Sequence, residues 1–424
     1  MYRVWDFVTT YSLLMIAGAV AALVWANIGP ASYEAFTSWT IWADAPVGHA
    51  HYAADGSVDS RDLTLQALVK DVLMAFFFFV AGKEVWEAVA LREGSLRGRR
   101  ALVPLAAAVG GMAVPVAVYL GLLALLAPDA WDALARGWAV PTATDIALSF
   151  IFARVIFGAG HPAVRFLLLL AIVDDALGLL ILAVAYPQGA LRPEWLLLSA
   201  GAALGAFLLF NWLPRRLDRG DEVRRHAGWV RRRLALWPYA VAGALSWYGF
   251  QQAGIHPALG LLPVIPAIPH ADRDFGVYAE AEDAMPDLLN RAEHLLKLPV
   301  EFILLLFGLT GAGVAVGAVG APTLLVLAGL LLGKPLGVLL FGWIAARGLG
   351  LPEGMGTRDV LVVGAIASMG FTVALFVAGV AFPEGEAQDA AKLGALLSVA
   401  GGAVAWALAR ALGVGRAGAV APAP

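Results

Sequence analysis

The sequence predicts an all-α polytopic membrane protein with about twelve transmembrane helices in a single domain, residues 1–424. Of its residues 60% are hydrophobic and 14% are charged, and the mean hydropathy is +0.77, which excludes a soluble surface for most of the chain. The apolar residues form long continuous runs, many of them near the roughly 20 residues with which a helix crosses a bilayer. A transmembrane β-barrel would instead show short segments of alternating apolar and polar residues.

The expected spans follow from these runs in order. They lie near Tyr11–Asn27, Leu63–Leu91, Ala101–Ala127, Trp138–Phe157, Pro162–Tyr186, Glu194–Trp212, Leu234–Phe250, Gly254–Ile268, Leu298–Val319, Thr323–Ile344, Val360–Phe382 and Leu393–Leu412. A polar external loop at residues 29–62 separates the first two spans, and its Asp55–Gly56 pair favours a small β-hairpin. The lack of cysteine excludes disulfides and cysteine-ligated metals.

The distribution of arginine predicts the orientation of the chain. Connections after even-numbered spans are basic, above all the loop 214–233, whereas those after odd-numbered spans are acidic or nearly uncharged. Cytoplasmic loops carry the excess of Lys and Arg, so we expect the even connections and both termini on the cytoplasmic side of the cell inner membrane. Topology thus explains the arginine run, and no nucleic-acid partner is expected.

Two adjacent carboxylates, Asp174 and Asp175, lie in the middle of the apolar run Leu167–Ala183. An ionisable group at bilayer depth costs at least ~2.5 kcal/mol, so two in succession need a water-filled cavity, an ion or a counter-charge. We interpret the pair as the functional centre. The alternative is structural: a loop between two short helices, or an ion pair with a basic residue. Gly178 is the only helix breaker nearby, which favours a continuous helix.

Span four contains a second group of polar residues. Pro141 precedes Thr142, Thr144 and Asp145. Proline frees an upstream backbone carbonyl, and the hydroxyl and carboxylate oxygens lie at the same depth. Oxygen ligands of this kind are typical of a site for a hard cation.

Spans ten and eleven contain the remaining buried polar features. Lys334 lies immediately before Pro335, far from either end of its apolar run, and must pair with a carboxylate or lose its proton. Gly370 lies between Ser368 and Thr372 in the middle of span eleven, where a glycine either weakens the helix or serves helix packing.

The interruptions at Pro141 and Gly370 suggest an architecture. Spans three to five and ten to twelve carry them at corresponding positions, which is typical of inverted repeats whose two broken helices cross at a mid-membrane site. The positive N-terminal ends of the half-helices would face carboxylates there, and the negative C-terminal ends would face a cation.

Four segments carry a resemblance to a known family. VPTATDIAL, LLLAIVDDALG, LLLGKPLGV and VVGAIASMGFTVALF, in that order, resemble the signature segments of the NhaA family of bacterial Na⁺/H⁺ antiporters. Shorter matches, among them AGIHPAL and EHLLK, extend the resemblance over nearly the whole chain. It implies a secondary active transporter for pH and sodium homeostasis that exchanges cytoplasmic Na⁺, or Li⁺, for external H⁺.

The resemblance also implies roles for individual residues. Asp175 would be the principal Na⁺ and H⁺ carboxylate, and Asp174 would be the partner of Lys334. Asp145 and Thr144 would lie at the broken crossing, with Asp175, Asp174 and Thr144 contributing Na⁺ ligands. The residues implied for the cytoplasmic entrance or the pH response are Glu84, His256, Glu293 and His294.

This chain departs from the family pattern at three places. The family usually has GLEVKRE in span two, where this chain has GKEVWEAVALREG; it usually has Asn where this chain has Gly311; and it is usually uncharged near Glu301. The roles that the resemblance implies in the pH response and at the cytoplasmic entrance are therefore the ones that transfer least well to this chain. An ordinary solvated helix start is an equal alternative for Glu293 and His294.

A carboxylate that must release a proton to bind Na⁺ makes the two ions compete for one site, and with alternating access this competition gives antiport. If Lys334 also releases a proton, transport is electrogenic.

Two other functions stay open: a Na⁺-coupled symporter of a small organic solute, and a proton-conducting membrane sensor. No enzymatic activity and no cofactor are expected. The expected partners are Na⁺, H⁺, the lipid bilayer and, as an open alternative, a second copy of the chain.

Overall fold

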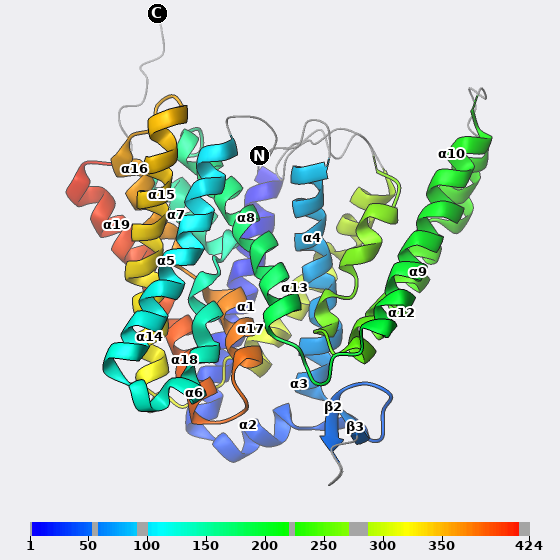
Figure 1. Ribbon diagram of the computed structural model, residues 1–424, viewed down its shortest axis with the longest axis horizontal. Coiled ribbons are helices and arrows are strands. Elements are labelled where there is room, and N and C mark those ends of the chain that lie inside the picture. Colours follow the sequence, from blue (N-terminus) through cyan, green and yellow to red (C-terminus); the bar gives the residue numbers. More distant parts are fainter. Residues whose placement is uncertain (1, 53–57, 91–100, 220–224, 271–286, 415–424) are drawn as a thin grey trace, which may run out of the picture.

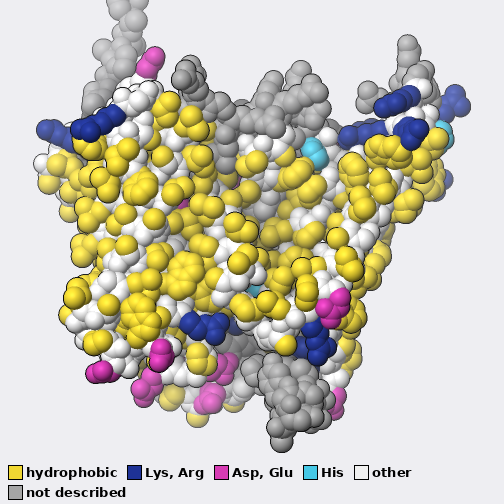
Figure 2. All heavy atoms as spheres, viewed as in Figure 1, with side chains coloured by type: hydrophobic (Ala, Val, Ile, Leu, Met, Phe, Trp, Pro, Cys, Tyr) yellow, Lys and Arg dark blue, Asp and Glu magenta, His cyan; other side chains and the backbone are white. Residues whose placement is uncertain are grey.

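The computed structural model describes residues 2–52, 58–90, 101–219, 225–270 and 287–414. Helices dominate these ranges, and they pack side by side with their axes running between two opposite edges of the molecule (Figure 1). Apolar side chains cover the band between the two edges (Figure 2). This is the surface that a bilayer requires of a helical bundle.

Seven continuous helical segments in the described ranges are long and apolar enough to cross a membrane. They are α3–η1–α4 (Leu65–Ala90), α5 (Leu102–Leu126), α8 (Pro162–Ala185), η5–α9–η6–α10 (Pro193–Leu217), α13 (Leu288–Gly311), α14–η11–α15 (Ala321–Leu349) and α18–η12–α19 (Glu386–Leu412). The all-α polytopic fold predicted from the sequence is confirmed.

Two further spans are bent pairs of helices. The first pair joins η3–α6–η4 (Pro128–Thr142) to α7 (Ile146–Phe157) at 48°, and the second joins α16 (Thr357–Ala367) to α17 (Phe371–Ala381) at 51°. The breaks fall at residues 143–145 and 368–370, beside Pro141 and at Gly370, so the two broken helices predicted from the sequence are confirmed.

The other three expected spans correspond to one long helix, one shorter helix and a pair of short 3₁₀ helices. They are α1 (Tyr2–Ile28), whose apolar part is Leu14–Ile28, then α12 (Trp237–Ala253), and the pair η8–η9 within Pro257–Ala267. The last consists of two short 3₁₀ helices, η8 (Pro257–Leu259) and η9 (Leu262–Ala267). Its prolines lack the backbone N–H that a continuous α-helix needs. Among the described residues, nine of the twelve expected spans are therefore apolar segments of membrane length, with each bent pair counted as one span, and α1 reaches that length with its 27 residues.

The two segments expected as loops contain regular structure. The first holds α2 (Pro30–Thr37) and a sheet in the order β1 (Thr40–Trp42), β3 (Val58–Thr64), β2 (His49–Tyr52), with antiparallel pairing throughout. Asp55 and Gly56, the expected turn, lie outside the described residues. In the second, α10 (Leu213–Leu217), α11 (Arg225–Trp229) and η7 (Val230–Leu234) are helical.

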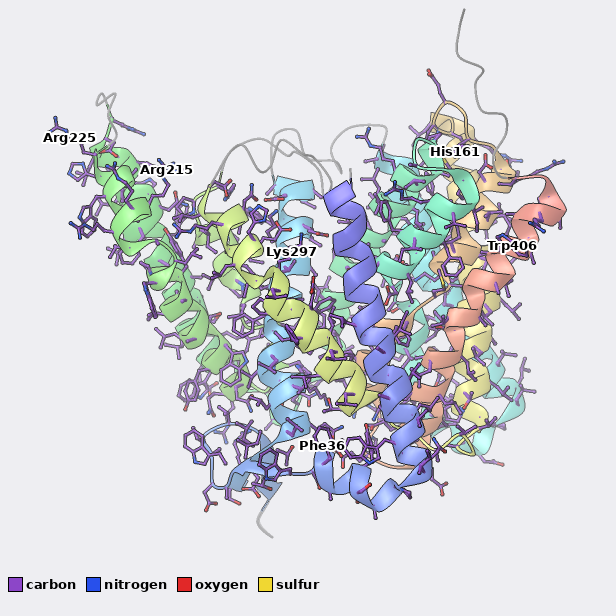
Figure 3. All side chains as sticks on the ribbon, turned by 180° about the vertical axis from the view of Figure 1, so that it is seen from behind. Phe36, His161, Arg215, Arg225, Lys297 and Trp406 are labelled. Carbon is purple, nitrogen blue, oxygen red and sulfur yellow. The ribbon has the colours of Figure 1, made fainter. Side chains whose placement is uncertain are left out.

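Charge separates toward the two edges. Basic side chains gather along the edge that carries α10, and acidic side chains gather along the opposite edge, with some basic side chains near them (Figure 2). Arg215 and Arg225 project from the outer end of the arm formed by α9 and α10, whereas Phe36 lies at the other edge (Figure 3).

A close contact between α5 and α15 (Lys334–Leu349) fixes the region around Lys334. A Cβ built on Gly337 would lie 2.1 Å from the carbonyl oxygen of Gly110, and one on Gly110 would lie 2.4 Å from the carbonyl oxygen of Gly337. Only glycine allows two backbones to approach this closely. The contact holds the helix that begins with Lys334 against the core.

Candidate ion-binding site

The two bent helices cross at their breaks. The backbone N–H of Asp145, at the start of α7, donates to the carbonyl of Met369 at 2.6 Å, and the Ser149 hydroxyl donates to the carbonyl of Ile366 at 3.2 Å. A Cβ on Gly370 would lie 3.1 Å from the carbonyl oxygen of Ala143, so the small residue permits the close crossing. These bonds satisfy polar backbone groups that the breaks would otherwise leave exposed to lipid.

Asp145 joins the two broken helices through both carboxylate oxygens. Its Oδ1 accepts from the backbone N–H of Leu148 at 2.9 Å and caps α7, while its Oδ2 accepts from the Thr372 hydroxyl and from the Thr372 backbone N–H at 3.2 Å. A carboxylate at a helix N-terminus satisfies an orphan donor and faces the positive end of the helix dipole. Asp145 is therefore an anchor of the crossing.

Asp174 lies on α8 and forms the centre of a buried polar group. Its Oδ2 lies 2.9 Å from the Lys334 ammonium, and both side chains are fully buried. The ammonium also donates to the Thr142 carbonyl at 2.5 Å. The Thr144 hydroxyl lies 2.7 Å from the same Asp174 oxygen and 3.1 Å from the Ala367 carbonyl. The second oxygen of Asp174, Oδ1, has no hydrogen-bond partner.

The backbone around Lys334 is irregular. Lys334 follows the π-helical turn η11 (Gly329–Gly333) and precedes Pro335. Proline lacks the N–H of a regular helix, and single π-helical turns of this kind often mark functional sites. A Cβ on Gly333 would lie 2.7 Å from Cα of Pro115 in α5. The tight packing leaves the ammonium directed at the crossing.

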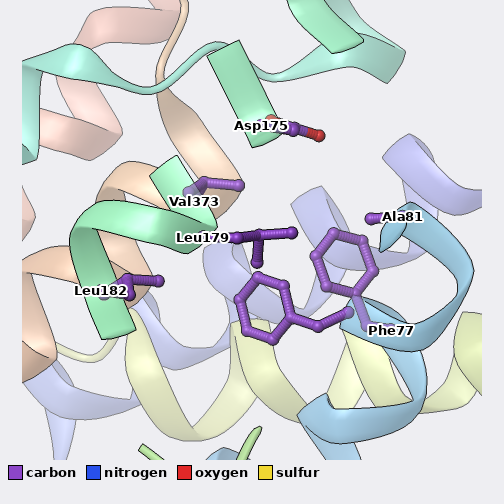
Figure 4. Close-up of a pocket in the computed structure, with 7 residues that line it drawn as sticks. Phe77, Ala81, Asp175, Leu179, Leu182 and Val373 are labelled. Carbon is purple, nitrogen blue, oxygen red and sulfur yellow. The ribbon is translucent and has the colours of Figure 1, made fainter. Parts of the chain in front are cut away.

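Asp175 faces a small cavity between α8 and α4 (Met74–Ala90), with room for about one water molecule (Figure 4). The side chain is half-buried, and its Oδ1 is buried without a hydrogen-bond partner. The rest of the cavity wall is apolar and consists of Phe77, Phe78, Ala81, Leu179, Leu182 and Val373. Asp175 therefore presents an unpaired carboxylate oxygen in a confined space, which suits binding of a proton or a small cation.

The comparison with known families decides what kind of protein this is. A family model described as Na⁺/H⁺ antiporter 1 matches residues 4–409, nearly the whole chain. The chain belongs to this family. The resemblance noted in the sequence is confirmed.

Individual relatives carry the same family name. The chain is 62% identical over 406 residues to a Na⁺/H⁺ antiporter NhaA of Jannaschia sp. (strain CCS1), and the match covers 95% of this chain and 96% of that protein. It is 42% identical to the antiporter NhaA of Desulfitobacterium hafniense (strain DSM 10664 / DCB-2), with 96% of each chain covered, and 41% identical to that of Geobacter sulfurreducens, with 96% and 97% covered.

The residues expected at the entrance or in the pH response lie in two places: Glu84, Glu293 and His294 on α4 and α13, and His256 at the start of η8. Glu84 on α4 interacts electrostatically with Glu293 on α13, with Lys83 and Glu87 of its own helix, and with Asp175. His294 is exposed on α13. His256 is fully buried at the start of η8, where its Nε2 has no hydrogen-bond partner and lies 3.8 Å from Oδ1 of Asp71.

Sequence reasoning missed Lys83 and the bond between Thr372 and Asp145. Lys83 is buried and pairs with Glu293 at 2.6 Å and with Glu87 at 2.9 Å. The spacing of four residues between Lys83 and Glu87 is a signal for such a pair, whereas nothing local indicates the contact with Glu293.

The structure also shows the surroundings of Glu301 and Gly311, two positions where the chain departs from the family pattern. Glu301 is half-buried on α13. At position 311 a Cβ would meet only ordinary contacts of 3.7 Å or more, so the glycine there is not demanded by packing.

Proposed function

We propose that this chain is a secondary active antiporter that exchanges Na⁺, or Li⁺, for H⁺. The observation that carries the proposal is the unpaired Oδ1 of Asp175 in its small cavity, one residue from the buried pair of Asp174 and Lys334. Na⁺ prefers oxygen ligands, and a carboxylate must be deprotonated to bind it. One site then serves both ions, but not both at once.

The proposed cycle assigns a task to each group. In the cation-free form Asp175 carries a proton, and the Lys334 ammonium neutralises Asp174. When Na⁺ enters, Asp175 releases its proton and binds the ion together with Asp174 and the Thr144 hydroxyl. The charge of Na⁺ then competes with Lys334 for Asp174, and Lys334 releases a second proton. Two protons leave for one Na⁺, so the site changes net charge and transport is electrogenic.

Reorientation would complete the cycle. The crossing of the bent helices lies beside Asp174, and the cavity of Asp175 lies between α8 and α4. Movement of the crossing bundle against α4 would expose Asp175 to one side of the membrane and then to the other, as in transporters built on broken helices.

The proposed orientation places the basic edge in the cytoplasm. The edge that carries α10 gathers the basic side chains, and cytoplasmic loops carry the excess of Lys and Arg. The chain would then lie in the cell inner membrane with both termini cytoplasmic, take up cytoplasmic Na⁺ and admit external H⁺. The β1–β3–β2 sheet would face outward, where the exposed side chains of Trp39, Ile41 and Trp42 support a role in a homodimer.

Proteoliposomes with an internal pH dye test the proposal. Na⁺ or Li⁺ added outside should enter the vesicles in exchange for H⁺ and alkalinise the lumen. K⁺ or choline should have a smaller effect or none. The response should change with a membrane potential set by valinomycin and K⁺. Vesicles that hold Asp175→Asn serve as the control. Proton movement without any added cation would favour the proton-conducting alternative, and a requirement for an organic solute would favour the symporter.

A further inference from the structure

Lys83 is a buried cation that the proposed exchange does not use. It lies on α4 two residues beyond Ala81, and Ala81 lines the cavity of Asp175 (Figure 4). Only 2% of its surface is exposed. Its ammonium lies 2.6 Å from Oε2 of Glu293 on α13 and 2.9 Å from Oε2 of Glu87, one turn further along α4. A buried lysine costs free energy unless such carboxylates compensate it.

The surroundings of Lys83 are acidic. The charged groups that act electrostatically on Glu84 are Glu293, Lys83, Asp175 and Glu87, and among these four only Lys83 is positively charged. The carboxylates among these groups attract cations, whereas the ammonium of Lys83 opposes that attraction.

An ammonium and a sodium ion compete for the same carboxylate oxygens. Because Lys83 is covalently attached beside Glu87 and Glu293, its effective concentration there is far above that of free Na⁺. It therefore competes with Na⁺ for these two carboxylates.

We propose that Lys83 sets the apparent Na⁺ affinity of the antiporter by acting as a tethered cation between Glu87 and Glu293. It is a positioning residue, because it acts through the carboxylates of Glu87 and Glu293 beside the cavity of Asp175 and does not itself bind the transported ion. The inference rests on the proposed Na⁺/H⁺ exchange.

Two substitutions separate this electrostatic role from a mechanical one. Lys83→Met and Glu293→Gln both remove the bridge between α4 and α13, but they change the local charge in opposite directions. The first should lower the apparent KM for Na⁺ roughly three- to tenfold, and the second should raise it. Lys83→Arg should stay near the parent, and the double variant should return toward the parent because its net charge is restored.

The measurement is Na⁺-driven proton release in proteoliposomes, at a pH where the parental rate no longer rises with pH. It is repeated with added choline chloride, which should shrink the difference between Lys83→Met and the parent because salt screens partly exposed charges. The carboxylates of Glu87 and Glu293 are partly exposed, so this screening is expected.

Each outcome decides one point. Shifts of KM in the same direction for both single variants, without recovery in the double variant, would show a mechanical tether and overturn the inference. If Lys83→Met does not fold, Glu293→Gln alone still tests it, because a KM that is unchanged or lowered contradicts the tethered cation. If the parent itself shows no exchange, the proposed function fails instead.

Discussion

Asp174 and Asp175 are neighbours in the chain but have opposite surroundings. Asp174 is buried and shares one oxygen between Lys334 and Thr144, whereas Asp175 is half-buried and turns an unpaired oxygen toward an apolar cavity. Successive residues of an α-helix point about 100° apart, so one turns to the crossing and the other to α4. Neighbouring carboxylates on one helix can therefore differ fully in compensation, and under the proposed function the compensated one would hold the site together while the uncompensated one would exchange ions.

The largest expected effect on transport comes from Asp175→Asn. The amide keeps the size of the side chain but cannot take up and release a proton as a carboxyl group does and carries no negative charge, so Na⁺-driven proton movement should fall to the level of empty vesicles. Thermal stability in detergent should change little, because Asp175 Oδ1 makes no hydrogen bond that the substitution would break. Exchange at the parental rate would remove Asp175 from the mechanism.

The largest expected effect on stability comes from Lys334→Gln. It leaves Asp174 buried without its counter-charge, at a cost of roughly 3 to 5 kcal/mol, and should lower the thermal midpoint accordingly. Any remaining transport should lose its response to membrane potential, because the second titrating group is gone.

The double variant Asp174→Asn with Lys334→Gln is the matched control. It should recover much of the stability without restoring the response to potential. Exchange in Lys334→Gln that still follows an imposed potential as in the parent would leave the lysine with a structural role only.

A smaller effect is expected from Asp145→Ala. The change removes the cap of α7, which is worth about 1 kcal/mol, together with the bonds to Thr372. Because the crossing loosens beside the site, the apparent KM for Na⁺ should rise. Lower thermal stability with an unchanged dependence on Na⁺ would instead make Asp145 purely structural.

The smallest effect is expected from Thr144→Val, which keeps the shape of the side chain and removes one hydroxyl. Asp174 retains its ion pair with Lys334, so the free energy of unfolding should fall by about 1 kcal/mol. The apparent KM for Na⁺ should rise less than in Asp145→Ala. Titration of the exchange rate with Na⁺ in both variants gives the order, and a larger shift for Thr144→Val would place that hydroxyl closer to the ion than Asp145.

The sequence was sufficient for those parts of the site that violate a local rule. Asp174, Asp175 and Lys334 are charges inside apolar runs, and a proline and Gly370 interrupt helices, so each is visible without tertiary information. The bond of Thr372 to Asp145 joins residues 227 positions apart. No local pattern encodes such a contact, since it arises only when the two breaks meet.

The position of Lys83 was hidden for a different reason. Charged residues near the end of a predicted span are usually solvated, and the structure instead buries Lys83 because α13 brings Glu293 against it. The prolines after Gly254 were visible in the sequence, and the structure shows their consequence, two short 3₁₀ helices in place of a full span.

The contact between Gly110 and Gly337 limits how the molecule can move and how its sequence can drift. With each position so close to the carbonyl of the other, a side chain at either one would force the helices apart. We therefore expect α5 and α15 to move as one rigid unit, with Lys334 as part of it. Many apolar residues of this protein can be exchanged for one another, but a Cβ at Gly110 or Gly337 would shift α15 and with it the Lys334 ammonium that faces Asp174.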